Sequence, residues 1–278
     1  MQTFSIRPFE APGDAAALRA EVRAFLAKHQ PSVDAAARSN SWAVADTEFT
    51  KALGAAGYIG MIWPKQFGGG GRHPLERYTV LEELLAAGAP VGMHWIADRQ
   101  GGPLLLRYGT DAQRKELLPR MASGELYTCI GMSEPGSGSD LASVRTRGAR
   151  EGDAWRVNGQ KVWTTNAHNA HYMIALVRTG EGSERQEGLT QFLIDLRLPG
   201  ITVRPIIDLV GGHDFNEVFL EEVMVPDAMR VGAEGAGWKQ VTAELSLERS
   251  GPERYLSSLA LLLEFIRLVG ADPTSAQA

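Results

Sequence analysis

The residues best suited to chemistry lie between positions 127 and 166. An apolar run, Leu126–Met132, leads directly into a loop rich in glycine and serine that spans 133–140. Backbone N–H groups in such a loop can form a concave anion-binding site, and glycine lets a ligand come close to the backbone. The loop therefore predicts a site for a phosphate group or a pyrophosphate.

A second segment brings an aromatic side chain and a hydroxyl close to this loop in the sequence. Asn158-Gly159 stands between two strand-like runs, and this dipeptide in that setting predicts a β-hairpin. Side chains two apart on a strand point the same way, so Trp163 and Thr165 would share a face. A flat ring and two hydroxyls, those of Ser133 and Thr165, beside a phosphate site suit a planar dinucleotide.

Together, MSEPGSGSDL (132–141) and NGQKVWTTN (158–166) resemble the paired flavin-binding signatures of the acyl-CoA dehydrogenase family. Two motifs in this order are a stronger signal than one glycine-rich motif alone. LGAAG (53–57) also resembles the family's N-terminal segment, and FLEEVMVP (219–226) resembles its closing strand. The resemblance implies that the chain binds FAD and desaturates an acyl-CoA thioester between its α and β carbons.

The resemblance also implies roles for individual residues. Ser133, with Met132, would meet the pyrimidine edge of the flavin, and Thr165 would approach its hydride-accepting nitrogen. Trp163 would cover one face of the ring. Singly, each residue also has a structural interpretation, such as a core tryptophan, a turn serine or a strand threonine. The residues that the resemblance assigns to FAD, the last two of them at its pyrophosphate, are Met132, Ser133, Trp163, Thr165, Gly138 and Ser139.

A catalytic base is expected near the end of the chain. In some family members the catalytic glutamate opens the C-terminal domain and directly precedes an arginine, and Glu248-Arg249 occupies that place. Glu248 is therefore the candidate general base, and Arg249 would orient it or the substrate. A carboxylate on an apolar stripe is desolvated, which makes it a stronger base. Two alternatives stay open: Glu244, one turn earlier, is the base, or Glu248 forms a structural ion pair, for example with Arg254.

Composition narrows the class of protein. The 278 residues are 44% hydrophobic and 22% charged, which is ordinary for a globular protein and argues against disorder. A net charge of −5 gives no basic field, so nucleic acid is not an expected partner. One cysteine, no signal-peptide pattern and no run as long as a membrane span favour a cytoplasmic protein. The 6 histidines lack metal-ligand spacing, so no metal site is expected.

The motifs must be positioned by two kinds of secondary structure. Helical periodicity dominates residues 1–125 and strand-like runs dominate 126–231, which predicts an α+β multidomain protein with an N-terminal α-helical domain and a central antiparallel β domain. The expected helices are Asp14–His29, Thr47–Tyr58, Leu75–Ala87 and Thr110–Ser123, with Asp14 and Thr110 as N-caps. The expected strands are 126–132, 155–157, 160–165, Tyr172–Arg178, Gln191–Leu196, Ile201–Ile206 and Glu217–Val225.

The third part, 232–278, returns to a helical pattern. From Gly237 onward an apolar stripe predicts one long helix, with a kink at Pro252 because proline has no N–H to donate. The family's C-terminal domain is a four-helix bundle, so this helix would be a partial bundle with an uncovered stripe. Three interpretations follow: a fragment or a prematurely ended version, one subunit of a hetero-oligomer whose partner supplies the rest, or a non-catalytic relative. A homo- or hetero-oligomer is expected.

The resemblance implies partners as well. They are an acyl-CoA substrate and an electron-transfer flavoprotein that accepts the electrons. Oxygen-using relatives, the acyl-CoA oxidases and flavin monooxygenases, share the scaffold and are alternatives within the flavoenzymes. The acyl group itself is not specified by these residues.

Overall fold

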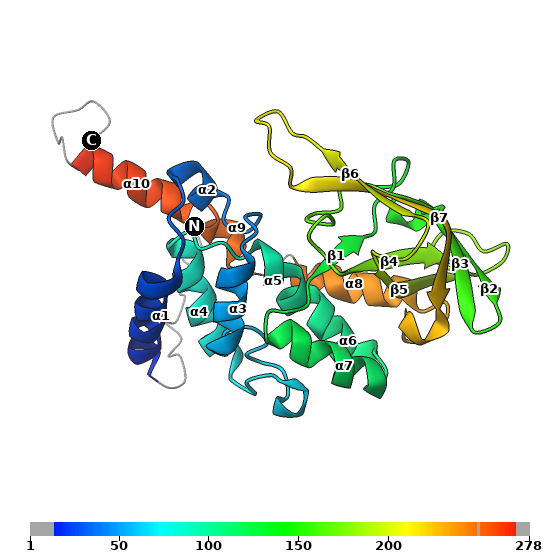
Figure 1. The fold of residues 1–278 in the computed structure, drawn as a ribbon, viewed down its shortest axis with the longest axis horizontal. Coiled ribbons are helices and arrows are strands. Elements are labelled where there is room, and N and C mark those ends of the chain that lie inside the picture. Colours follow the sequence, from blue (N-terminus) through cyan, green and yellow to red (C-terminus); the bar gives the residue numbers. More distant parts are fainter. Residues whose placement is uncertain (1–13, 249–250, 271–278) are drawn as a thin grey trace, which may run out of the picture.

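The computed structural model describes residues 14–248 and 251–270. Along the chain, helices come first and last and the strands come between them; in space, the sheet lies at one end of the molecule and the last helix lies beside the first ones (Figure 1). Within these residues, none of the helices combines the length and the apolar content that a membrane span requires. The helices that precede the first strand are α1 (Ala15–His29), α2 (Ala35–Ser39), α3 (Thr47–Ala55), α4 (Pro74–Ala86), α5 (Gly92–Ile96), α6 (Gly102–Tyr108) and α7 (Asp111–Ala122).

Local capping explains where two of these helices begin. The Asp14 side chain accepts a hydrogen bond from the Ala17 N–H at 2.9 Å at the start of α1. Thr110 accepts from the Gln113 N–H at 3.2 Å, and the Gln113 side chain accepts from the Thr110 N–H in return. Both contacts satisfy N–H groups that a helix start leaves unpaired. The two predicted N-caps are confirmed.

The sheet carries the second half of the fold. Its strand order is β6-β7-β3-β2-β4-β5-β8, and β1 pairs with β4 beside this path. The pairs are antiparallel, except that β4 runs parallel to β1 and, at one residue pair, to β2. The predicted α+β class is confirmed. The strands are β1 (Thr128–Gly131), β2 (Arg147–Glu151), β3 (Ala154–Lys161), β4 (Tyr172–Arg178), β5 (Leu189–Asp195), β6 (Ile201–Ile206), β7 (Phe215–Pro226) and β8 (Arg230–Val231).

The hairpin predicted at Asn158-Gly159 is wrong. Strand β3 runs straight through this dipeptide, and its register against β7 shifts between Val157 and Gly159, which is a β-bulge. A Cβ at Gly159 would lie 2.4 Å from the Thr146 hydroxyl, so the glycine permits close packing. The turn lies earlier, between β2 and β3, where Gly152 has a φ of 61°.

The single long C-terminal helix is also wrong. The described segments are α8 (Gly237–Glu248), α9 (Glu253–Leu256) and α10 (Leu259–Gly270). Pro252 stands at the start of α9, where its carbonyl accepts from the Leu256 N–H at 2.9 Å and its missing N–H costs that helix no hydrogen bond. Helix α8 contacts β5, whereas α10 lies against α2 and α4 (Figure 1).

A short π-helical segment, η2 (Ala97–Gly101), joins α5 to α6. A Cβ at the next residue, Gly102, would lie 2.0 Å from the ring of Trp63, which is buried. The Trp63 ring therefore packs directly on the helix backbone, and only glycine leaves room for it.

We expect Gly102→Ala to destabilise the fold. The added methyl group must displace the Trp63 ring, at a cost of roughly 1–3 kcal/mol for an overpacked core, which exceeds the roughly 1 kcal/mol that alanine adds to helix propensity. Thermal unfolding measures this as a lower midpoint. Gly136→Ala is the control, because its Cβ would meet nothing within 4 Å. Equal midpoints for the two variants would contradict the packing argument.

Candidate functional site

All the residues predicted to bind the cofactor line one cavity. It has a volume of about 360 Å³ and lies between the loop after β1, the segment after β3 and helix α8. The two motifs therefore meet in space, although the hairpin expected to place them there does not form. The lining residues are Ile96, Ile130, Met132, Ser133, Gly138, Ser139, Leu141, Val162, Trp163, Thr165, Trp238, Thr242 and Leu245.

Direct hydrogen bonds join the first motif to the second. The Val162 N–H donates to the Ser133 carbonyl at 2.9 Å, and the Lys161 ammonium donates to the Met132 carbonyl at 3.2 Å. Lys161 also donates to the Leu176 carbonyl at 2.7 Å, so strand β4 is held as well. These bonds fix the backbone of Met132 and Ser133 against the end of β3.

A buried ion pair completes this junction. Lys161 is fully buried and Glu134 is 8% exposed, and their charged atoms lie 2.8 Å apart. The backbone N–H groups of Arg145 and Thr146 also donate to the Glu134 carboxylate, at 2.6 and 2.9 Å. Burial opposes ionisation of Glu134, but Lys161 and these donors together hold its pKa below the ordinary value. Sequence reasoning did not identify this pair.

The segment that carries Trp163 and Thr165 has an unusual backbone. Trp163 has a φ of 58° and Asn166 a φ of 55°, a region that side-chain-bearing residues seldom adopt. The buried Asn216 holds the segment in place: its carbonyl accepts from the Thr164 N–H and its side-chain amide donates to the Thr164 carbonyl, each at 3.0 Å. Strain held by surrounding contacts is common at functional sites.

Several polar groups at the cavity have no partner within the described residues. The hydroxyls of Ser133 and Thr165 make no hydrogen bond there, and neither do the backbone N–H groups of Gly138 and Ser139. A Cβ at Gly138 would meet nothing within 4 Å, so packing inside the described chain does not require this glycine. Trp163 is 58% exposed at the cavity. These features fit a planar ligand that bears phosphate groups.

Helix α8 forms one wall of the cavity with Trp238, Thr242 and Leu245. Glu244 lies on another side of this helix, is 2% exposed, and accepts a hydrogen bond from the Gln191 side chain at 2.5 Å. It is absent from the cavity lining, which argues against the alternative that Glu244 is the base. Glu248 is the last residue of α8; its side chain, and Arg249 entirely, lie outside the described residues.

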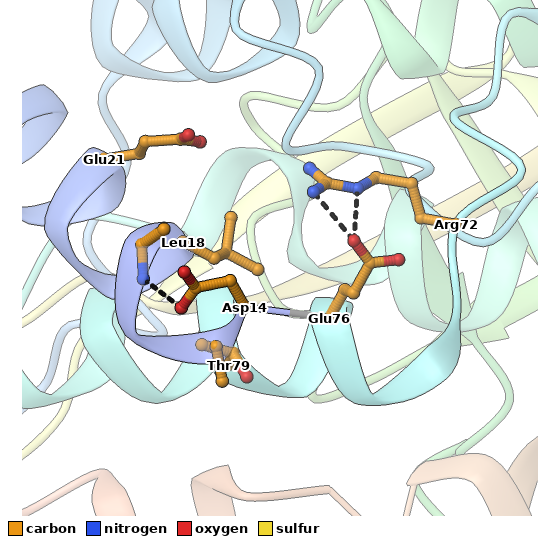
Figure 2. Close-up of a pocket in the computed structure, with 8 residues that line it drawn as sticks. Asp14, Leu18, Glu21, Arg72, Glu76 and Thr79 are labelled. Carbon is orange, nitrogen blue, oxygen red and sulfur yellow. Dashed lines mark hydrogen bonds and ion pairs between the residues drawn. The ribbon is translucent and has the colours of Figure 1, made fainter. Parts of the chain in front are cut away.

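A second pocket, of about 200 Å³, lies between α1 and α4 (Figure 2), and no residue of the two motifs lines it. Three of its polar side chains are engaged within the elements that form it. Asp14 caps α1, and Arg72 donates to Glu76 at 2.8 and 3.1 Å. This pocket is therefore explained by the packing of the helices.

Two family models match the chain in succession. The model for the acyl-CoA dehydrogenase N-terminal domain matches residues 13–125, and the model for the acyl-CoA dehydrogenase middle domain matches residues 129–223. The chain belongs to the acyl-CoA dehydrogenase family. Among curated relatives, it is 37% identical over 274 residues to acyl-CoA dehydrogenase IpdE1 of Mycobacterium tuberculosis, a match that covers 94% of this chain and 71% of IpdE1.

Solved structures of acyl-CoA dehydrogenases share the fold. The Tcur3481-Tcur3483 steroid ACAD G363A variant aligns with a TM-score of 0.85 and 31% identity, over 95% of this chain and 69% of that one. The ChsE4-ChsE5 complex from Mycobacterium tuberculosis aligns with a TM-score of 0.75 and 35% identity, over 87% of this chain and 62% of that one. A glutaryl-CoA dehydrogenase from Mycobacterium smegmatis in complex with FADH2 aligns with a TM-score of 0.71 and 28% identity, over 86% of this chain and 60% of that one. The chain thus spans roughly two thirds of the length of these proteins.

We expect Lys161→Met to lower stability by roughly 3–5 kcal/mol, because it leaves the Glu134 carboxylate buried without its counter-charge. Adding Glu134→Gln to the same protein should recover most of the loss, since no charge then remains buried. Urea unfolding of both single variants and the double variant measures this coupling. Lys51→Met, which breaks an exposed pair with Glu48, is the control and should change little. Additive losses in the double variant would refute the ion-pair account.

Proposed function

We propose that this chain binds FAD in the cavity between the two motifs. The observation that carries the proposal is the convergence of Ser133, Trp163, Thr165 and the 138–139 backbone on one cavity, with polar groups left unpaired inside the described chain. The ring would stack on the exposed Trp163, the two hydroxyls would donate to its polar edge, and the free N–H groups would receive the pyrophosphate.

The proposed reaction is α,β-dehydrogenation of an acyl-CoA thioester. The α-proton leaves to a carboxylate, a hydride leaves the β-carbon, and a carbon–carbon double bond forms. FAD, when bound, supplies the acceptor for that hydride. Glu248 is the proposed base, because it ends the helix whose earlier turns line the cavity, and Arg249 would orient it. An electron-transfer flavoprotein is the proposed acceptor of the electrons.

Trp163 gives the first test of flavin binding. We expect Trp163→Ala to weaken FAD binding about tenfold or more, since a lost aromatic stacking contact costs roughly 1–3 kcal/mol, and Trp163→Phe to retain most of the affinity. Quenching of flavin fluorescence on titration measures both. Ile207→Ala is the matched control, because Ile207 is also 58% exposed and lies outside the cavity. Unchanged affinity in Trp163→Ala would place the flavin elsewhere.

The base is tested separately from the cofactor. Glu248→Gln should keep FAD but slow its bleaching by acyl-CoA by roughly 10²–10⁴-fold, the usual contribution of a general base. Glu234→Gln, on the exposed approach to α8, is the control. A panel of linear, branched and ring-bearing acyl-CoAs supplies the substrates, and ring-bearing chains have priority because a similar structure is a steroid ACAD. Full-speed bleaching in Glu248→Gln would move the base to another residue.

A second candidate function is a subunit that needs a partner chain. Helix α10 favours it, because its large apolar side chains are about half exposed among the described residues. Such a face usually marks an interface, and a similar structure is the ChsE4-ChsE5 complex. The absorbance spectrum of the protein purified alone separates the two candidates: a bound-flavin spectrum favours the first, and flavin uptake only after addition of a partner chain favours the second. The apolar side chains on α10 are Leu261, Leu262, Leu263, Phe265, Ile266 and Leu268.

A further inference from the structure

Helix α8 is tied to the sheet along the side that faces away from the cavity. At its first turn, Gly237 approaches β5 so closely that a Cβ would lie 2.7 Å from the Leu189 carbonyl. One turn later the Gln240 side-chain amide donates to the Val231 carbonyl at 2.8 Å. Another turn later Glu244 meets the sheet. Residues three or four apart share a helix face, so these contacts form one line.

Glu244 makes the last of these contacts, and the buried groups around it include few hydrogen-bond donors. The Gln191 Nε2 donates to Glu244 Oε2, but Glu244 Oε1, Gln191 Oε1 and Gln240 Oε1 are buried with no partner among the described residues. All three unpaired atoms are acceptors when the carboxyl is ionised. Buried acceptors without donors cost free energy, so an ionised Glu244 fits this place poorly.

A protonated carboxyl reduces this shortage. It supplies one O–H donor, and the Oε1 of Gln191, whose Nε2 already bonds the same carboxyl, can accept it. Burial raises the pKa of Glu244 to about 8, and the only opposing influence is the hydrogen bond from Gln191. No charged group contributes to this shift. The titratable or charged residues on the elements that contact α8 are Asp195 in β5, Arg230 in β8, Asp98 and Arg99 in η2, and Arg107 and Tyr108 in α6.

We propose that Glu244 is a positioning residue: a neutral carboxylic acid whose O–H bonds a buried amide oxygen, so that α8 is held on β5 and the cavity wall stays in place. Gln191 on β5 bonds this carboxyl from the sheet side. On the cavity side, the attachment holds Trp238, Thr242 and Leu245 in fixed positions. The importance of that wall for ligand binding rests on the proposed function. The attachment of α8 itself does not.

The proposal has a definite pH dependence. Below pH 4.5, the ordinary pKa of glutamate, the carboxyl is protonated in the folded and unfolded states alike. Between that value and about 8 the folded state keeps the proton while the unfolded state loses it, so the ratio of folded to unfolded protein falls as the pH rises. Above about pH 8 the buried carboxyl itself ionises, and the α8 contact weakens.

Amide hydrogen exchange along α8 tests this without any flavin. The ratio of α8 exchange rates, wild type over Glu244→Gln, is compared at about pH 6.5 and at about pH 9. It should rise roughly 30-fold between them, because the opened wild-type carboxyl loses its proton, which shifts the equilibrium about tenfold per pH unit up to the folded-state pKa of about 8 and no further. Comparison of the two proteins at the same pH cancels the intrinsic pH dependence of exchange. Glu48→Gln, an exposed glutamate, is the matched control and should follow wild type at both pH values.

A second variant guards against a folding failure of the first. Gln191→Met removes the amide and should speed exchange in α8 already at about pH 6.5, because the acid then loses its partner. Two results would each overturn the proposal. One is a ratio of wild-type to Glu244→Gln exchange rates in α8 that is the same at both pH values, and the other is unchanged α8 exchange in Gln191→Met. Titration of the same samples with FAD tests the proposed function separately: failure to bind at any pH would refute that function and leave the exchange result to decide the role of Glu244.

Discussion

The buried Lys161–Glu134 ion pair is the interaction on which the candidate site depends. It lies where two segments distant in the sequence meet, and the same ammonium also holds the Met132 and Leu176 carbonyls. A buried charge is tolerable only when it is paired and hydrogen-bonded, so the two segments are strongly held in one arrangement. That arrangement brings the glycine–serine loop to the segment that carries Trp163, and the cavity forms between them.

Much of the fold could be predicted from local patterns. The expected strands Tyr172–Arg178 and Ile201–Ile206 agree with β4 and β6, and the caps at Asp14 and Thr110 form as expected. The failures have a common physical cause. Glycine at 159 serves close packing against Thr146 instead of a turn, and one apolar stripe after Gly237 is divided among helices with different partners. Short-range patterns cannot distinguish these cases, because the deciding contacts come from remote residues.

The residues of the candidate site also fall into two groups, those that could be named from the sequence and those that could not. The side chains that the family resemblance assigns to a cofactor were named from the sequence, because two motifs in order carry them. Residues that position them were not. Lys161, Asn216 and Gln191 act through contacts with residues far away in the sequence, which local patterns do not show even for Lys161, inside the second motif. Glu244 was considered as a base because of its place one turn before Glu248, yet its side chain faces the sheet.

The central claim is that the loop at 133–141 and the segment at 162–165 bind one flavin together. Hydrogen exchange of the purified chain with and without FAD measures this directly, because bound ligand slows exchange where it covers the backbone. The account predicts that FAD slows exchange in both segments at once, with half-saturation at the same FAD concentration. Protection confined to one segment, or found only outside the two, would contradict it.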